Sequence, residues 1–140
     1  MRPDRVREGR RWLDQAIRDL DDARFCIGGQ RFSLGCFVAQ QAAEKALKAF
    51  LYVASPEDPW GHSVADLCAE AASLDEDFRA LAPEAAPLDK FYIPTRYPNG
   101  LPGGIPAEAF SIEDAGGAIA MADKVLALVS TKLPPARQHK

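Results

Sequence analysis

The chain has 140 residues, of which 47% are hydrophobic and 26% charged, and its formal net charge is −3. This length and composition fit one compact domain with its own core. The longest uninterrupted apolar run, Ala49 to Ala54, is far too short to cross a bilayer. We therefore expect one cytoplasmic domain over residues 1–140, with a core at about 8–133, a flexible tail at 134–140, and no membrane contact.

The acidic balance excludes a general nucleic-acid-binding surface, although a local basic site stays open. The three cysteines, Cys26, Cys36 and Cys68, form no C-x-x-C pair. We expect them to be reduced thiols of the core. The sequence predicts neither a metal site nor a cofactor.

Two long helices are expected first. Apolar residues recur at three- and four-residue steps from Arg7 to Ile27, and Gly28-Gly29 is expected to end that helix. Ser33 is a candidate N-cap of the second helix, which we expect to end at about Ala54, before Pro56. The wide apolar surface of the second helix predicts a place at the centre of the fold.

Shorter elements follow. Ser63 to Asp66 has the S-x-x-D form of a capping box and predicts a helix through about Ser73. The acidic residues from Asp75 predict a short turn, and a further helical stretch is expected from Glu84 to Tyr92.

The last third of the chain combines a loop and a helix. Prolines and glycines punctuate residues 95–110 and predict a long irregular loop. Ser111 to Asp114 is a second capping box, and the helix behind it is expected to end by Leu133. Gly116-Gly117 inside it suggests close helix contact, within the bundle or across a dimer, and tolerance of an imperfect helix is the alternative. The fold class is therefore all-α, an antiparallel up-and-down bundle of four to five helices with a long Pro/Gly-rich loop before the last helix.

A narrow polar band on the second helix is the strongest functional signal. At 100° per residue, five polar side chains fall within about 140° of an otherwise apolar helix. They are Gln40, Gln41, Glu44, Lys45 and Lys48. The lysines and amides can bind phosphate, base or sugar, but the band can equally be a hydrogen-bonded seam to another helix or subunit.

Arg96 is the best single candidate for anion contact. Its guanidinium can bind phosphate with two nitrogens, and Pro94 and Pro98 stiffen the backbone around it. Tyr97 can stack on a base, and Tyr92 and Lys90 are weaker candidates. The alternative is that Arg96 binds helix-end carbonyls or Glu44 while Tyr97 packs in the core.

Three segments carry a resemblance to a known family. They are Phe37–Ala49 (FVAQQAAEKALKA), His62–Leu67 (HSVADL) and Tyr92–Pro98 (YIPTRYP). In order and spacing they resemble the HEPN family, named for nucleotide binding in higher eukaryotes and prokaryotes, and the likeness spans about residues 8–133. The segment from Thr95 to Phe110 is also similar to the HEPN domain of sacsin.

The resemblance implies a small helical bundle that forms homodimers, acts beside a minimal nucleotidyltransferase, and in some branches binds a nucleotide such as ATP or GTP or cleaves RNA. HEPN ribonucleases share an Arg, four to six residues, and a His. Here the nearest arginines before His62 and His139 are Arg31 and Arg137, and neither spacing matches. The expected function is therefore a non-catalytic module that binds a nucleotide or nucleic-acid phosphate. The alternatives are a protein–protein adaptor or toxin–antitoxin-like subunit and, less favoured, a ribonuclease with an altered site.

Overall fold

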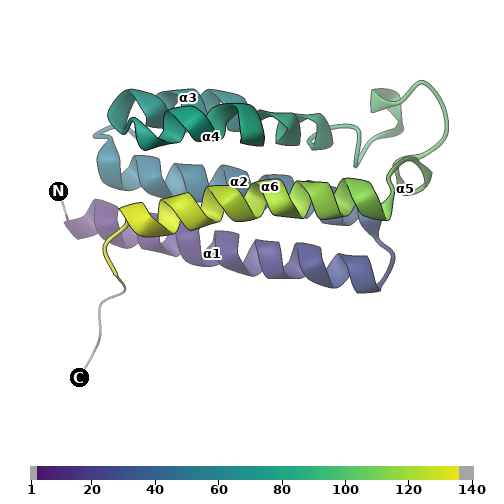
Figure 1. Ribbon diagram of the computed structural model, residues 1–140, viewed down its shortest axis with the longest axis horizontal. Coiled ribbons are helices and arrows are strands. Elements are labelled where there is room, and N and C mark those ends of the chain that lie inside the picture. The colour runs from purple at the N-terminus through teal and green to yellow at the C-terminus, as the bar shows by residue number, and fades with distance from the viewer. Residues whose placement is uncertain (1–2, 136–140) are drawn as a thin grey trace.

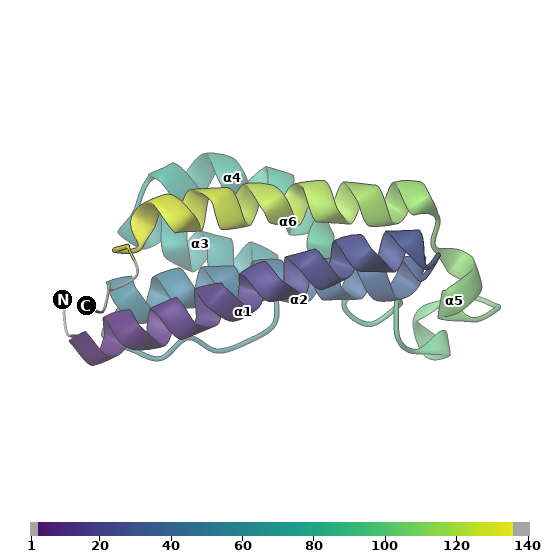
Figure 2. The same cartoon turned by 90° about the horizontal axis from the view of Figure 1, so that it is seen from below.

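The computed structural model describes residues 3–135 as a helical bundle. Three long helices, α1, α2 and α6, run side by side, and the shorter α3 and α4 cover one side of α2 and α6 (Figures 1 and 2). The helices are α1 (Pro3–Gly28), α2 (Phe32–Ala54), α3 (Val64–Leu74), α4 (Asp77–Ala85), α5 (Pro106–Ala109) and α6 (Ile112–Lys132), with 3₁₀ helices η1 (Ala86–Phe91) and η2 (Pro98–Gly100). The predicted all-α class is confirmed. Residues 136–140 of the predicted tail lie outside the described range.

The first two helices form a tight antiparallel hairpin. The first helix ends at Gly28, as predicted, and the chain turns at Gln30, which has a positive φ of 58°. The Arg31 N–H donates to the Cys26 carbonyl at 2.9 Å. Farther along, Gly9 lets the helices approach closely, because a Cβ there would lie 2.7 Å from the Ala49 carbonyl oxygen. The hairpin therefore depends on small residues at the α1–α2 contact.

The second helix occupies the centre, as its apolar surface predicts. Most of its residues from Gly35 to Leu51 are buried, and it contacts α1, α3, η1, α5 and α6. The largest fully enclosed apolar side chains come from several elements: Leu13, Leu47, Leu51, Val64, Leu67, Phe78, Leu88, Val125 and Val129. No helix within residues 3–135 combines the length and apolarity needed to cross a membrane.

Both predicted capping segments lie at helix N-termini, but only Ser111–Asp114 forms the reciprocal capping box; at Ser63 the serine bond alone is formed. The Ser63 hydroxyl accepts from the Asp66 N–H at 3.0 Å, and Ser111 and Asp114 bond to each other's backbone at the start of α6. The predicted cap at Ser33 is wrong. The second helix begins two residues earlier, at Phe32, with Arg31 in the cap position and no side-chain bond.

Residues 77–110 are more regular than the sequence indicates. A helix runs from Asp77 to Ala85 through Pro83, where only a short turn was expected. It tightens into η1, so no separate helix begins at Glu84. Burial of Phe78, Leu81, Ala85 and Leu88 at three- and four-residue steps outweighs the bond that Pro83 cannot donate. The predicted irregular loop holds two short helical turns, η2 and α5, each beginning with a proline.

Candidate functional site

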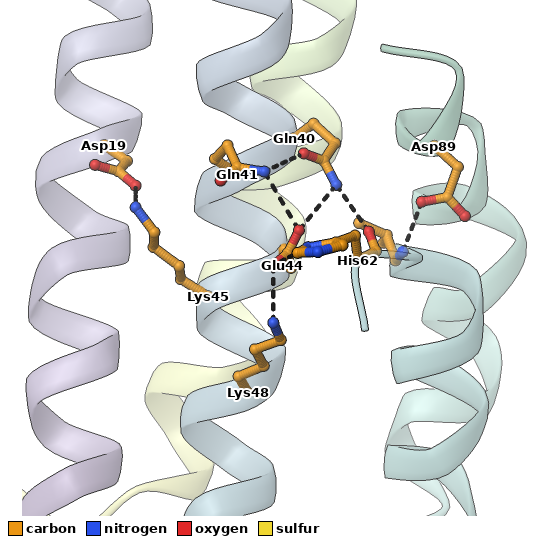
Figure 3. Close-up of polar contacts among 9 residues, drawn as sticks. Asp19, Gln40, Gln41, Glu44, Lys45, Lys48, His62 and Asp89 are labelled. Atoms are coloured by element: carbon orange, nitrogen blue, oxygen red, sulfur yellow. Dashed lines mark hydrogen bonds and ion pairs between the residues drawn. The ribbon is translucent and has the colours of Figure 1, made fainter. Parts of the chain in front are cut away.

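The polar band of α2 is largely buried. Gln40, Glu44 and Lys48 expose 0%, 4% and 7% of their surface, whereas Gln41 and Lys45 are half-buried. Because charged side chains are rarely enclosed unless they are paired, the partners of these residues decide what the band can do. Figure 3 shows that the band divides into two separate groups of contacts.

Glu44 is the hub of the first group. Its Oε2 accepts from the Lys48 ammonium at 2.9 Å and lies 3.2 Å from His62 Nδ1. Its Oε1 accepts from the amides of Gln41 and Gln40 at 3.3 and 3.4 Å. The buried carboxylate thus has four partners, which compensate for its loss of hydration.

The two glutamines extend this network to the loop before α3. The Gln40 amide donates to the His62 carbonyl at 3.0 Å, and its own oxygen accepts from the Gln41 amide at 2.7 Å. The amides therefore bond to protein groups on both sides. A hydrogen-bonded network of this kind fixes one arrangement of the helix and the loop.

Lys45 belongs to a separate group that faces α1. Its ammonium lies 2.5 Å from Asp19 Oδ2, and Gln15 donates to the other Asp19 oxygen at 2.8 Å. Lys45 also lines an open groove of about 600 Å³ along α1 with Glu8, Arg11, Trp12, Asp14 and Gln15. Of the six predicted ligand-binding residues, only Lys45 lines this groove, whose charges are mixed in sign.

On the other side of Glu44, the His62 ring lies on the ring of Tyr92. The ring centroids are 5.0 Å apart and the planes are inclined by 18°, which is a stacked geometry. Asp89 joins η1 to the start of α3, because its carboxylate accepts from the Ser63 hydroxyl and from the Val64 and Ala65 N–H groups at 2.6–3.1 Å. This carboxylate also stabilises the positive end of the α3 dipole.

Arg96 follows Tyr92 and is surrounded by aromatic rings. Its guanidinium carbon lies 4.3, 4.6 and 5.1 Å from the ring centroids of Phe37, Tyr92 and Tyr97. Its Nε donates to the Tyr92 carbonyl at 2.8 Å. Within residues 3–135, no carboxylate lies within ion-pair distance of Arg96. The rings hold the cation in place, and no carboxylate of the described residues neutralises it.

The remaining candidates lie at the surface. Tyr97 is 50% exposed, so it does not pack in the core, and Lys90 is exposed on η1. The six predicted residues therefore lie in several places: Lys48 and Gln41 in the buried network, Lys45 in the groove, Arg96 and Tyr97 in the aromatic cluster, and Lys90 on η1. Arg96 makes one of the two structural contacts considered for it, a carbonyl bond, and not the other, a pair with Glu44.

Two important residues carried little sequence signal. Phe37 reads as an ordinary apolar residue of α2, yet its ring is the nearest of the three to the Arg96 guanidinium. Asp89 contacts groups 24 to 26 positions earlier in the chain, and no local motif marks such a bond. The Phe37–Gln41 spacing of one helical turn was the available hint, because it places the ring beside the polar band.

The cysteines show no sign of a reactive centre. Burial raises the pKa of the Cys36 and Cys68 thiols to about 12, with the carboxylates of Asp114 and Asp89 adding to the rise. All three cysteines are free. In the described part of the chain, no three His, Cys, Asp or Glu side chains converge in a way that could hold a metal ion.

Comparison with known proteins decides the family. The model of the HEPN domain matches residues 10–132. The chain belongs to the HEPN family. Among curated proteins, no sequence matches this HEPN chain.

Three solved structures share the architecture of this HEPN domain. TT1696 from Thermus thermophilus is 42% identical, with a TM-score of 0.80 over 89% of this chain and 98% of the other. The archaeal HEPN homologue ST0689 is 35% identical, with a TM-score of 0.74 over 90% and 98%. The HEPN domain protein TM0613 from Thermotoga maritima is 27% identical, with a TM-score of 0.67 over 86% and 95%. The predicted family is thereby confirmed, whereas the likeness to sacsin stays a prediction.

Proposed function

We propose that this HEPN domain is a non-catalytic cytoplasmic module that binds a nucleotide or nucleic-acid phosphate at Arg96. We further propose that it works as a homodimer beside a minimal nucleotidyltransferase, as the family resemblance implies. One observation carries the binding proposal: the Arg96 guanidinium is fixed by aromatic rings and a single carbonyl bond, with no carboxylate partner among the described residues.

The chemistry of this arrangement suits a phosphate. The Nε of Arg96 is bound to the Tyr92 carbonyl, which leaves its two terminal nitrogens for an anion. Those nitrogens can bind two oxygens of one phosphate side by side. Because the guanidinium is already ordered against Phe37 and Tyr92, binding loses less side-chain entropy than it would with a mobile arginine.

Tyr97 supplies a surface for a base. Its ring is half-exposed and lies 5.1 Å from the Arg96 guanidinium. Stacking of a base on such a ring is worth about 1–3 kcal/mol. Lys90 stays a secondary candidate for phosphate contact, while Lys45 and Lys48 are committed to Asp19 and Glu44 and are expected to contribute little.

The proposal of a non-catalytic role rests on the neighbours of His62. In the described structure its ring contacts Glu44 and Tyr92, and no hydroxyl or thiol nucleophile is bonded to it. The Arg-to-His spacing of the HEPN ribonucleases is also missing from the whole sequence. A pure preparation should therefore leave single-stranded and structured RNA intact, and cleavage by wild type that a His62→Ala variant lacks would contradict this role.

Calorimetric titration tests the binding proposal. Wild-type protein should release or absorb heat with at least one of ATP, GTP and a short single-stranded RNA. Lys90→Ala, which removes one positive charge at the secondary candidate for phosphate contact, should weaken binding less than Arg96→Ala does. Absence of heat with all three ligands at millimolar concentration would contradict nucleotide binding.

A second function, an adaptor between proteins, is favoured by two exposed aromatic side chains. Phe25 and Trp60 expose 84% and 85% of their surface, and large apolar side chains of this kind often anchor protein interfaces. Co-expression with a nucleotidyltransferase encoded beside this chain should give a complex. If Phe25→Ser and Trp60→Ser abolish that complex while ATP binding is unchanged, the two functions are separate.

A further inference from the structure

We propose that Glu44, although buried, is a positioning residue for the Arg96 site and acts through His62 and Tyr92. This inference deepens the proposed function and rests on it for its role in binding. It assigns the polar band of α2 a purpose other than direct ligand contact. The route has three steps, from the carboxylate to the imidazole, from the imidazole to the phenol ring, and from Tyr92 to the guanidinium.

The first step fixes His62. The His62 side chain is 60% exposed, so little packing restrains it, and its Nδ1 lies 3.2 Å from the Glu44 carboxylate. The Gln40 amide holds the His62 carbonyl at 3.0 Å. Backbone and ring are thus anchored to adjacent turns of α2, most of which is buried. Loss of the carboxylate would leave the ring attached to α2 only through its backbone.

The second step transfers that order to Tyr92. The imidazole covers the phenol ring in a stacked geometry, with centroids 5.0 Å apart. Phe37 lies farther from Tyr92, at 6.3 Å, in a tilted arrangement. Aromatic pairs contribute about 0.5–1.5 kcal/mol beyond their buried area. His62 is therefore the closer of the two rings that set the orientation of Tyr92.

The third step reaches the binding group. Tyr92 contacts Arg96 twice, through its ring at 4.6 Å from the guanidinium carbon and through its carbonyl, which accepts from Nε at 2.8 Å. A change in the position of Tyr92 therefore changes both the direction of the guanidinium and the hydrogen bond that orients it. Two ordered contacts to one residue make Arg96 sensitive to events at His62.

Direct contact between Glu44 and a ligand is the weaker alternative. Only 6% of its side chain is exposed, it is paired with Lys48, and a carboxylate repels phosphate. The buried Glu44 carboxylate is costly to keep in the core, and its partner His62 lies at the edge of the Arg96 site, stacked on Tyr92. The same reasoning makes Lys48 a support for Glu44 and not a contact to phosphate.

The test uses two readouts. The first is the ¹H–¹⁵N NMR signal of the Arg96 Nε–H group, assigned by its loss in Arg96→Lys, which the surrounding rings should shift away from the signals of exposed arginines. The second is the affinity for ATP. In Glu44→Gln and His62→Ala, the signal should move toward the exposed arginines, and the affinity should fall about three- to tenfold, or about 0.7–1.4 kcal/mol.

Asp19→Asn is the matched control, because it breaks the other charge pair of the band, with Lys45, and does not touch Tyr92. It should leave both readouts unchanged. His62→Phe should keep an aromatic ring stacked on Tyr92, so its Arg96 signal should lie nearer the wild-type position than that of His62→Ala. A general loss of stability would not produce this difference. An unmoved Arg96 signal in Glu44→Gln, or an equal movement in Asp19→Asn, would overturn the inference. If wild type fails to bind ATP, the ATP claim fails, and the NMR signal alone still decides the positioning role.

Discussion

The ammonium group of Lys48 lies 2.9 Å from the Glu44 carboxylate, and both side chains are more than nine-tenths enclosed. This pair spans one turn of α2 and would be worth a few tenths of a kcal/mol on an exposed helix. Its enclosure changes the energetics, because removal of one partner leaves the other charge buried. It also explains how a helix at the centre of the bundle tolerates a polar band.

Lys48→Met should destabilise the protein by about 3 kcal/mol, because the Glu44 carboxylate would lose its ionic partner inside the protein. Lys45→Met should cost about 1 kcal/mol or less, since Lys45 is more exposed. Urea denaturation at neutral pH measures both. Adding Glu44→Gln to Lys48→Met should recover part of the loss, and a double variant as unstable as the sum of the single variants would contradict the buried-pair account.

Gly9 and Gly117 should respond in opposite ways to alanine. A Cβ at Gly9 would lie 2.5 Å from Val53 Cγ2 and 2.7 Å from a backbone oxygen, so Gly9→Ala should destabilise by about 1–3 kcal/mol. A Cβ at Gly117 would meet no group of residues 3–135 within 4 Å beyond its own stretch of helix, so Gly117→Ala should stabilise by about 1 kcal/mol through helix propensity. Thermal unfolding checks both. Stabilisation by Gly9→Ala would contradict the close α1–α2 contact.

The cysteines should differ in reactivity. At pH 8, thiols with a pKa of about 12 are almost fully protonated, and Cys36 and Cys68 are also buried. A thiol reagent such as Ellman's reagent should therefore modify Cys26 first and the other two only after unfolding in denaturant. If the double variant Cys36→Ser/Cys68→Ser shows no further modification on unfolding, the two thiols that react only in denaturant are Cys36 and Cys68. Rapid modification of all three thiols in the folded protein would contradict the packing described.

Asp89 should stabilise the start of α3 more than its position on η1 suggests. Asp89→Ala removes the acceptor of two backbone N–H groups and one hydroxyl, and should cost about 1–3 kcal/mol. Asp66→Ala, at an exposed acidic residue in the same first turn, is the control and should cost less. Hydrogen exchange at Val64 and Ala65 should accelerate in Asp89→Ala; unchanged protection there would count against the clamp.

The sequence predicted most of the fold because its signals are local. Apolar periodicity and two serine caps located α1, α3 and α6 to within a few residues, except that α1 begins nearer the N-terminus than expected. The helix through Pro83 was missed because burial of Phe78 and Leu81, a tertiary effect, outweighs the local penalty of proline. Gly116 and Gly117 suggested a close helix contact. Within residues 3–135, however, a Cβ at either position would meet no neighbouring element within 4 Å, so packing inside the bundle does not require glycine there.

The candidate site was predictable only in part. Spacing on one helix placed the band residues on one arc, and proline-flanked Arg96 was identified as the best anion contact. The depth of Glu44 and Lys48 could not be predicted, because it depends on segments distant in the chain. The His62 loop reaches Glu44 from 18 positions away, and the Lys48 ammonium lies 5.7 Å from the ring centroid of Trp12 in α1. The aromatic surroundings of Arg96 likewise combine α2 with the segment after η1, which no local pattern reports.

The affinity of wild type and Arg96→Ala for ATP, measured by calorimetry at one fixed salt concentration, tests the binding account most directly. Hydrogen bonds to a charged group contribute about 1.5–3 kcal/mol, so Arg96→Ala should weaken binding about ten- to a hundredfold. The variant should stay folded, since Arg96 is only half-buried and forms no ion pair within residues 3–135. Measurable binding by wild type that Arg96→Ala retains in full would contradict the proposal that Arg96 is the phosphate-binding residue.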